Sequence, residues 1–207
     1  MSLSPSPLER LNRARADLRM GLPVVLTSGS EGALVVSAEV LTTERLDDLR
    51  RIGTPVVALT ARRAETLKAR AYDGDLARVA LPADAGVAWI EALADPADDL
   101  THPMKGPLIS VRDGNASLHR AAIRLVKSAQ LLPSAVVVAL PMAMEFAQEH
   151  SLTTLSVDET EAPETRLDPV IAARLPMRLA GMGRLHVFRP QDGGTEHYAI
   201  EVGRPMR

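Results

Sequence analysis

The sequence contains no cysteine, and aromatic residues make up only 2% of its 207 residues. The absence of cysteine excludes disulfides, thiol nucleophiles and thiolate-bound metals within this chain. Because aromatic residues are so few, a hydrophobic core has to be built from Leu, Val, Ile, Ala and Met. A hydrophobic share of 46% and a charged share of 24% are typical of a globular protein. The length suffices for one well-buried domain, or for one domain and part of another.

An excess of positive charge is also absent, since the net charge is −2. Proteins that bind nucleic acids usually carry a basic excess, so we expect no nucleic-acid partner. No apolar run approaches the ~20 residues that span a bilayer, and residues 1–15 lack the apolar core of a signal peptide. We therefore expect no membrane association and a cytoplasmic location.

Strand patterns alternate with helical patterns along residues 7–157, which predicts an α/β domain. Ser6, Pro7 and Glu9 indicate a helix start with a capping box. Residues 134–140 are almost wholly apolar, which is typical of a strand buried on both faces. The predicted strands are residues 22–27, 33–39, 55–59, 77–82, 107–111, 134–140 and 152–157. The predicted helices are residues 7–20, 43–53, 61–71, 83–93, 116–132 and 141–150.

The C-terminal part has a different character. Residues 158–169 are acidic and contain proline, which predicts a linker. Two strand patterns follow at residues 183–190 and 196–202, joined by a turn at residues 191–194. A lone β-hairpin is marginally stable in water. We therefore predict a C-terminal β-hairpin fragment beside the first domain.

Residues that could carry chemistry are scattered. None of the five histidines stands at the spacing of a paired metal site. The segment from Ser28 to Gly32 lacks the ending of a phosphate-binding loop, so a tight strand connection is favoured. Six aspartates are expected on a solvated surface: Asp73, Asp75, Asp84, Asp95, Asp98 and Asp99. The residues alone therefore predict an α/β domain and assign no function.

Four segments, in this order, resemble 3,4-dihydroxy-2-butanone-4-phosphate synthase, which makes a four-carbon precursor of riboflavin from ribulose 5-phosphate. They are "RADLRMGLPVVLTSGSEGALVVSAEVLTTERL", "LADPADDLTHP", "AAIRLVKSAQLLPSAVVVAL" and "EFAQEHSLTTLSV". The resemblance covers residues 7–158. It implies a three-layer α/β/α fold around a mixed sheet, and a homodimer, because active members of the family are homodimers.

The departures from this family concentrate at its active site. The family's long acidic loop, which supplies carboxylates for magnesium and proton abstraction, is reduced here to residues 27–33, and only Glu31 and Gly32 remain from its end. His119 stands one residue away from the family's metal-binding histidine, a rotation of ~100° on a helix. We therefore expect no catalytic, cofactor-binding or metal-binding residues, with Glu31, His102 and His119 as remnants of the site.

Residues 174–203, "RLPMRLAGMGRLHVFRPQDGGTEHYAIEVG", resemble the first strands of GTP cyclohydrolase II. In that family the zinc cysteines come later, so the resemblance implies no zinc within this chain. We divide the chain into a degenerate synthase-like domain at residues 1–158, a linker at residues 159–173, and the opening strands of a cyclohydrolase domain at residues 174–207.

Together these resemblances imply the N-terminal part of a riboflavin-biosynthesis protein of the GTP cyclohydrolase II type. The segment itself is expected to be an inactive structural or dimerising domain. Two alternatives stay open. One is a regulatory module that binds a sugar phosphate or a flavin through a cationic pocket, with Arg112, Arg120 and Arg124 as candidates. The other is a residual synthase, which would need magnesium.

Overall fold

A computed structural model describes residues 3–97, 99–100, 103, 105–161 and 166–203. The chain divides into two compact units, residues 1–161 and residues 162–207, and each is described by itself. Among the described residues, no helix is long and apolar enough to cross a membrane.

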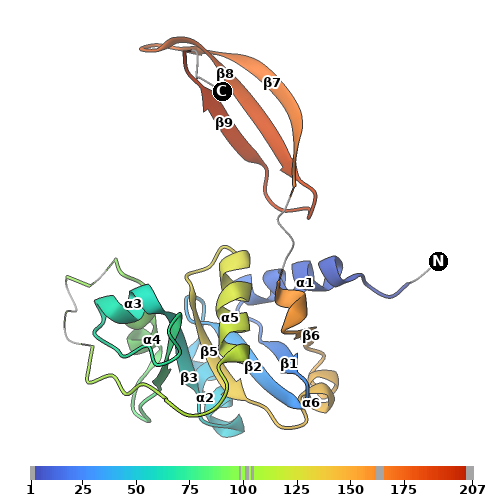
Figure 1. The fold of residues 1–207 in the computed structure, drawn as a ribbon. Helices are drawn as coiled ribbons and strands as arrows, with labels where there is room; N and C mark the ends of the chain where they lie inside the picture. Colours follow the sequence, from blue (N-terminus) through green and yellow to red (C-terminus); the bar gives the residue numbers. More distant parts are fainter. Residues whose placement is uncertain (1–2, 98, 101–102, 104, 162–165, 204–207) are drawn as a thin grey trace. The chain divides into compact units, whose positions relative to one another are not determined.

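The first unit is built on a six-stranded mixed sheet with the strand order β4-β3-β5-β2-β1-β6 (Figure 1). The pair β1 and β6 is parallel, and the other neighbouring strands are antiparallel. The strands are β1 (Val24–Ser28), β2 (Glu31–Ser37), β3 (Val56–Thr60), β4 (Leu76–Ala80), β5 (Ser134–Ala139) and β6 (Thr153–Ser156).

Helices cover both faces of this sheet, so the predicted three-layer α/β arrangement is confirmed. Residues of α1 and α5 pack on one face, and residues of α2, α3, α4 and α6 pack on the other. In Figure 1, α5 lies in front of the strands. The helices are α1 (Pro7–Arg19), α2 (Thr43–Ile52), α3 (Ala61–Thr66), α4 (Val87–Ala94), α5 (Ser117–Ser128) and α6 (Ala143–Glu149), followed by a 3-10 turn η1 (Asp158–Thr160).

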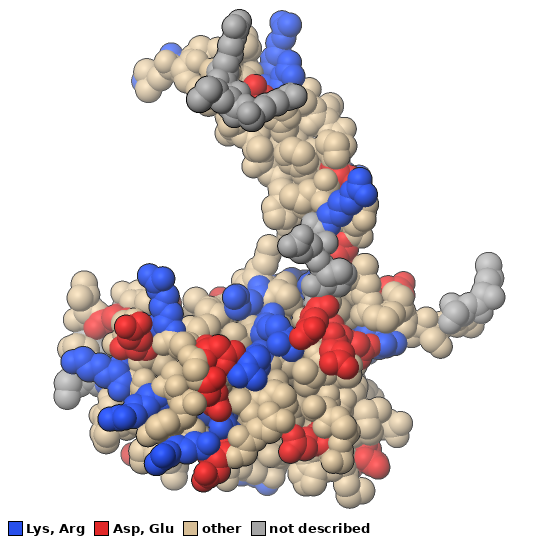
Figure 2. Space-filling view, viewed as in Figure 1, with Lys and Arg blue, Asp and Glu red and all other residues tan. Residues whose placement is uncertain are grey.

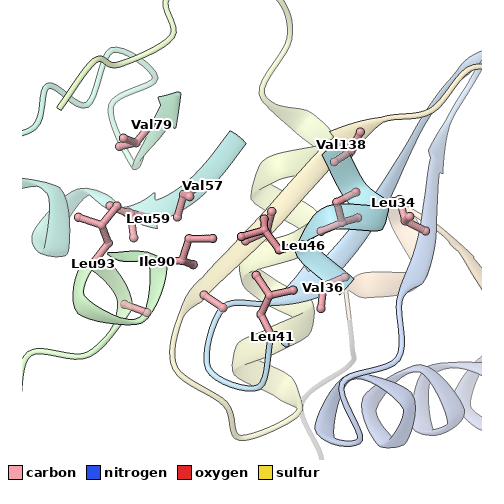
Figure 3. Close-up of a cluster of buried hydrophobic side chains, with 14 of the residues drawn as sticks. Leu34, Val36, Leu41, Leu46, Val57, Leu59, Val79, Ile90, Leu93 and Val138 are labelled. Carbon is pink, nitrogen blue, oxygen red and sulfur yellow. The ribbon is translucent and has the colours of Figure 1, made fainter. Parts of the chain in front are cut away.

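The core consists of two hydrophobic layers that share the strands between them. Because successive side chains of a strand point to opposite faces, Val136 and Val138 of β5 enter one layer while Ala135 and Val137 enter the other. Figure 3 shows the layer under α2 and α4, in which Ile90 and Leu93 of α4 lie beside Leu59 of β3. The prediction that β5 is buried on both faces is therefore confirmed.

Two local predictions are confirmed in detail. Ser6 accepts a hydrogen bond from the backbone N–H of Glu9, and the Glu9 carboxylate accepts one from the N–H of Ser6, which completes the capping box of α1. The β1–β2 connection is a two-residue turn in which Gly29 has φ +59°, a conformation that glycine adopts without strain.

Residues 107–111, predicted as a strand, form only an isolated bridge between Ser110 and Val79 at the free edge of β4. Two backbone hydrogen bonds tie this segment to β4, from Ala80 N to the Ile109 carbonyl (2.8 Å) and from Val111 N to the Arg78 carbonyl (2.7 Å). Pro107 has no N–H, so the ladder cannot extend toward the start of the segment. The segment thus covers the edge of β4 without becoming a seventh strand.

The second unit is a three-stranded antiparallel sheet, not the hairpin that the sequence predicts. Its strands are β7 (Leu167–Met177), β8 (Gly181–Pro190) and β9 (His197–Glu201). The first of them begins inside the segment predicted as a linker. Proline is unfavourable inside a sheet, so its presence argues against predicting a strand here. In the structure β7 is an edge strand, and the register shift between Pro169 and Ile171 accommodates Pro169.

The two units differ in how much they bury, which predicts unequal stability. Of the described residues of the second unit, only Gly183 and Pro190 are buried. We expect that ending the chain after Glu161 leaves the melting temperature of the first unit essentially unchanged. Amide exchange at Val187 and Ile200 should be at least about 100-fold faster than at Val137 in β5. Equal protection, together with unfolding on truncation, would show that the two units form one cooperative structure.

Candidate functional site

Glu31 is the first residue of β2 and lies exposed at the turn that joins β2 to β1. Ser28 pairs with Glu31 across this turn, so only Gly29 and Ser30 lie outside the ladder. Gly32 is buried against α6, where an added Cβ would lie 2.2 Å from the Cβ of Ala143. The turn is therefore too short to carry further carboxylates beside Glu31.

His119 lies in the first turn of α5, beside the buried Arg78 of β4 and near Asp73. Burial, followed by the positive charge of Arg78, lowers the pKa of His119 to about 4, while the negative charge of Asp73 opposes the shift. Its Nδ1 atom is buried and has no hydrogen-bond partner among the described residues. At neutral pH this histidine is therefore an uncharged imidazole with little access to solvent.

Arg78 organises the surroundings of His119. It donates two hydrogen bonds to Asp73, at 2.8 Å and 3.0 Å, and a third to the carbonyl of Asp113 at 2.8 Å. Its side chain is 3% exposed, so the guanidinium is removed from water and compensated by these acceptors. The cluster joins β4 to the loop before α5 and fixes where that helix begins.

Glu31 and His119, the two remnants among the described residues, lie on different parts of the sheet. In the sheet order, β3 and β5 separate β4 from β2, so at about 4.8 Å per step these two strands lie about 14 Å apart. Glu31 stands at the tip of β2, whereas His119 lies beside Arg78 of β4. His102 lies outside the described residues.

The arrangement does not fit a divalent cation either. Magnesium needs several oxygen ligands at one point. In the part of the chain that the structure describes, no three His, Asp or Glu side chains come close enough to hold a metal ion. Asp73 is bonded to Arg78, and both oxygens of Asp75 accept hydrogen bonds from Arg120, at 2.6 Å and 2.7 Å.

The arginines expected to line a cationic pocket are engaged elsewhere. Arg112 lies over the ring of Tyr72, with its guanidinium carbon 4.9 Å from the ring centroid, and Arg120 pairs with Asp75. Arg124 donates a hydrogen bond to Thr160 (3.2 Å) and lies 3.6 Å from Glu161. Figure 2, which views the α5 side of the first unit, shows basic and acidic side chains intermixed. These three arginines are therefore used in internal contacts.

Two aspartates predicted on a solvated surface are in fact only partly exposed and are paired with cations. Asp73 bonds Arg78, as described above, and its side chain is 14% exposed. Asp99 bonds both Arg63 and Lys105, and hydrogen bonds from these cations hold the pKa of the Asp99 carboxyl far below its usual range. Arg63 also donates to the carbonyls of Ala92, Leu93 and Asp95. The cluster ties α3 to the end of α4, and no spacing in the sequence indicates it.

A groove on the face of the sheet opposite α5 was also not predicted. It lies between α2 and α6 and has a volume of about 500 Å³, within the range of small-molecule pockets. The sequence signal was faint: Phe146 and His150 are spaced i and i+4 on α6, so their rings meet on one face of that helix.

The lowered pKa of His119 predicts a pH-dependent stability. In the folded state the imidazole stays neutral down to about pH 4, whereas in the unfolded chain it binds a proton below about pH 6.5. The unfolded state therefore binds more protons between these values, and stability falls as the pH decreases through this window. The free energy of unfolding of the unchanged chain should therefore decrease between pH 7 and pH 5. In His119→Gln we expect this decrease to be smaller by about 1–2 kcal/mol.

Denaturant titrations at the two pH values, with His150→Gln as the exposed control, measure this difference. An NMR titration of His119 should give a midpoint near 4. A midpoint near the ordinary value of histidine would show that the side chain is solvated.

Comparisons with known proteins bear on the origin of this arrangement. No family model matches the chain. A GTP cyclohydrolase-2 of Azospirillum brasilense is 32% identical over 220 residues, an alignment that covers 100% of this chain and 56% of the relative. A 3,4-dihydroxy-2-butanone 4-phosphate synthase of Shewanella pealeana is 28% identical over 197 residues, covering 76% of this chain and 93% of the relative. The chain thus spans about half the length of the cyclohydrolase.

The fold has solved counterparts. A two-domain 3,4-dihydroxy-2-butanone 4-phosphate synthase from A. baumannii superposes with a TM-score of 0.57 at 16% identity, covering 94% of this chain and 70% of that structure. At this identity the likeness concerns the fold alone. The chain is therefore related over its whole length to GTP cyclohydrolase-2, and it contains a domain like 3,4-dihydroxy-2-butanone 4-phosphate synthase.

Proposed function

We propose that the first unit is a catalytically inert scaffold within a protein of the GTP cyclohydrolase II type. The chain is related to proteins of riboflavin biosynthesis. The observation that supports inertness is the separation of the remnants: Glu31 stands exposed at a strand tip, while His119 is an uncharged imidazole held beside Arg78.

The chemistry of a synthase explains why this separation matters. Rearrangement of a sugar phosphate requires a base, a hard divalent cation and oxygen ligands that converge on the same substrate atoms. A proton acceptor must lie within hydrogen-bond reach of the proton it removes. Glu31, at the tip of β2, and His119, beside Arg78 of β4, belong to parts of the sheet that β3 and β5 separate, which is the arrangement that supports the proposal. The sheet and the helices are retained, so the unit keeps a structural use.

The remaining parts of the proposal concern the whole protein. Residues 174–207 would be the opening strands of a cyclohydrolase domain, and its zinc would be held by residues beyond this chain. A boundary near residue 158, a homodimer formed through the first unit and a cytoplasmic location belong to the same proposal. Met142 and Met144, 72% and 51% exposed at the start of α6, are apolar side chains available for such a dimer contact.

The inert scaffold predicts no synthase turnover. Incubation of the chain with ribulose 5-phosphate and magnesium should release no formate above the level of a protein-free blank, while an active synthase measured in parallel does. Turnover that disappears in Glu31→Ala or in His119→Gln would instead establish a residual synthase. Arg62→Gln, which changes an exposed arginine on α3, is the control.

The homodimer predicts a mass twice the 22.2 kDa of the chain. Light scattering behind gel filtration measures this mass directly, and dilution into the low micromolar range tests whether the dimer is stable. Met142→Lys places a charge on an exposed position and should weaken a dimer formed through the start of α6. A monomer at all concentrations would contradict the dimerising role and leave inertness to the formate assay.

A further inference from the structure

We propose that the groove between α2 and α6 binds a planar aromatic ring that carries an acidic group. A flavin or purine nucleotide has this chemistry. The proposed function enters only in the choice of a flavin as a probe, because the chain is related to proteins of riboflavin biosynthesis. The site itself is argued from the residues that line the groove.

The floor and the ends of the groove are apolar. Leu34 of β2 and Leu49 of α2 are buried in the core layer beneath it. Pro23 and Leu152, from the connections that lead into β1 and β6, complete the apolar lining together with Leu22 and Ile52. A surface of this kind removes the faces of a flat ring from water, which is the main favourable contribution to binding such a ring.

Arg45 supplies the charge that is left without a partner. It lies in the first turn of α2, lines the groove and is half-buried. In the described structure its guanidinium takes part in no hydrogen bond or ion pair, since the contact found for Arg45 is that of its backbone N–H with Thr42. A guanidinium favours a carboxylate or phosphate as its partner, because its donors match two acidic oxygens.

The other charged residues of the groove do not supply that partner. Asp48 is the acidic residue of the lining, and its carboxylate accepts a hydrogen bond from Arg51 at 2.6 Å. Arg51 is therefore paired with the acidic residue of the lining. The lining keeps a surplus of positive charge at Arg45, on the side of the groove formed by α2.

The opposite side offers an aromatic platform. Phe146 and His150 of α6 have ring centroids 4.3 Å apart and planes tilted by 44°. Phe146 is one of only two phenylalanines in the chain. Flat rings pack favourably against such side chains in offset or tilted geometry. A ligand with its ring near Phe146 and its acidic group near Arg45 would satisfy both sides.

The volume suits a small molecule. A space of about 500 Å³ lies in the range of pockets for single small ligands. A second copy of the chain is the competing occupant, and the experiment below includes it.

Calorimetric titration of the full 207-residue chain tests the site with four probes. FMN carries a ring and a phosphate, GMP a different ring and a phosphate, riboflavin the ring without the phosphate, and inorganic phosphate no ring. We expect FMN, GMP or both to bind, and their comparison identifies the ring system. Riboflavin and inorganic phosphate should each bind at least about tenfold more weakly than the best nucleotide, since each lacks one of the two contacts.

Two variants locate the binding. Arg45→Gln removes the charge and should weaken nucleotide binding by about tenfold or more, the effect of losing a charge-assisted hydrogen bond. Phe146→Leu keeps an apolar side chain and should weaken all ring-bearing probes while leaving phosphate unchanged. Arg62→Gln, an exposed arginine on α3 outside the groove, is the matched control, and melting curves confirm that each variant is folded.

Three results would overturn the inference. The first is that no nucleotide binds more tightly than about 1 mM. The second is that Arg45→Gln binds as tightly as the unchanged chain. The third is that Arg45→Glu converts a dimer into a monomer while nucleotides do not bind, which would assign the groove to a second copy. The formate assay stands apart from all three, so the inert-scaffold proposal and this one can fail separately.

Discussion

The structure of the first unit depends on the burial of β5 from both faces. This strand pairs with β2 on one side and β3 on the other, and its valines contribute to both core layers. A strand in this position exposes no polar face, so helices have to cover the sheet on both sides. The three-layer fold follows from this requirement, and none of the residues that meet it lies in a catalytic loop. A chain can therefore keep the scaffold of a synthase after its loops have shortened.

Charged residues adapt this scaffold at its edges and limit what the old site can do. Arg78 interrupts an apolar strand, and its buried guanidinium has to be satisfied by Asp73 and by carbonyls before α5. These bonds fix the start of α5 and place His119 against a positive charge. The same contacts that anchor the helix thus disfavour the protonated imidazole. The Arg63–Asp99–Lys105 cluster has a comparable anchoring use at the ends of α3 and α4.

The sequence predicts those features that depend on neighbouring residues. The capping box of α1, the turn at Gly29 and the apolar run of β5 are signals contained in a few consecutive positions, and each is confirmed. Prediction from the sequence fails where contacts between residues distant in the chain decide the structure. Residues 107–111 look like a strand, but Pro107 and the position of the segment at the edge of β4 allow only a bridge. Likewise the start of β7 was predicted as a linker because it is acidic and contains Pro169, which is accommodated by the bulge and the edge position of β7 beside β8. The partners of Asp73 and Asp99 are set by tertiary contacts, and Phe146 and Arg45 meet at one groove although they are far apart in sequence.

The groove and the remnants of the synthase site belong to different layers of the first unit. His119 is carried by α5, which packs on one face of the sheet, whereas α2 and α6 pack on the other. Side chains of one strand alternate between these faces, so a change in the loops near α5 leaves the floor residue Leu34 in place. The proposed loss of the catalytic constellation would therefore put no constraint on Arg45 or Phe146. Conversely, the contacts of the scaffold leave the guanidinium of Arg45 without a partner among the described residues. An acidic group bound in the groove, as proposed above, would give this charge a partner.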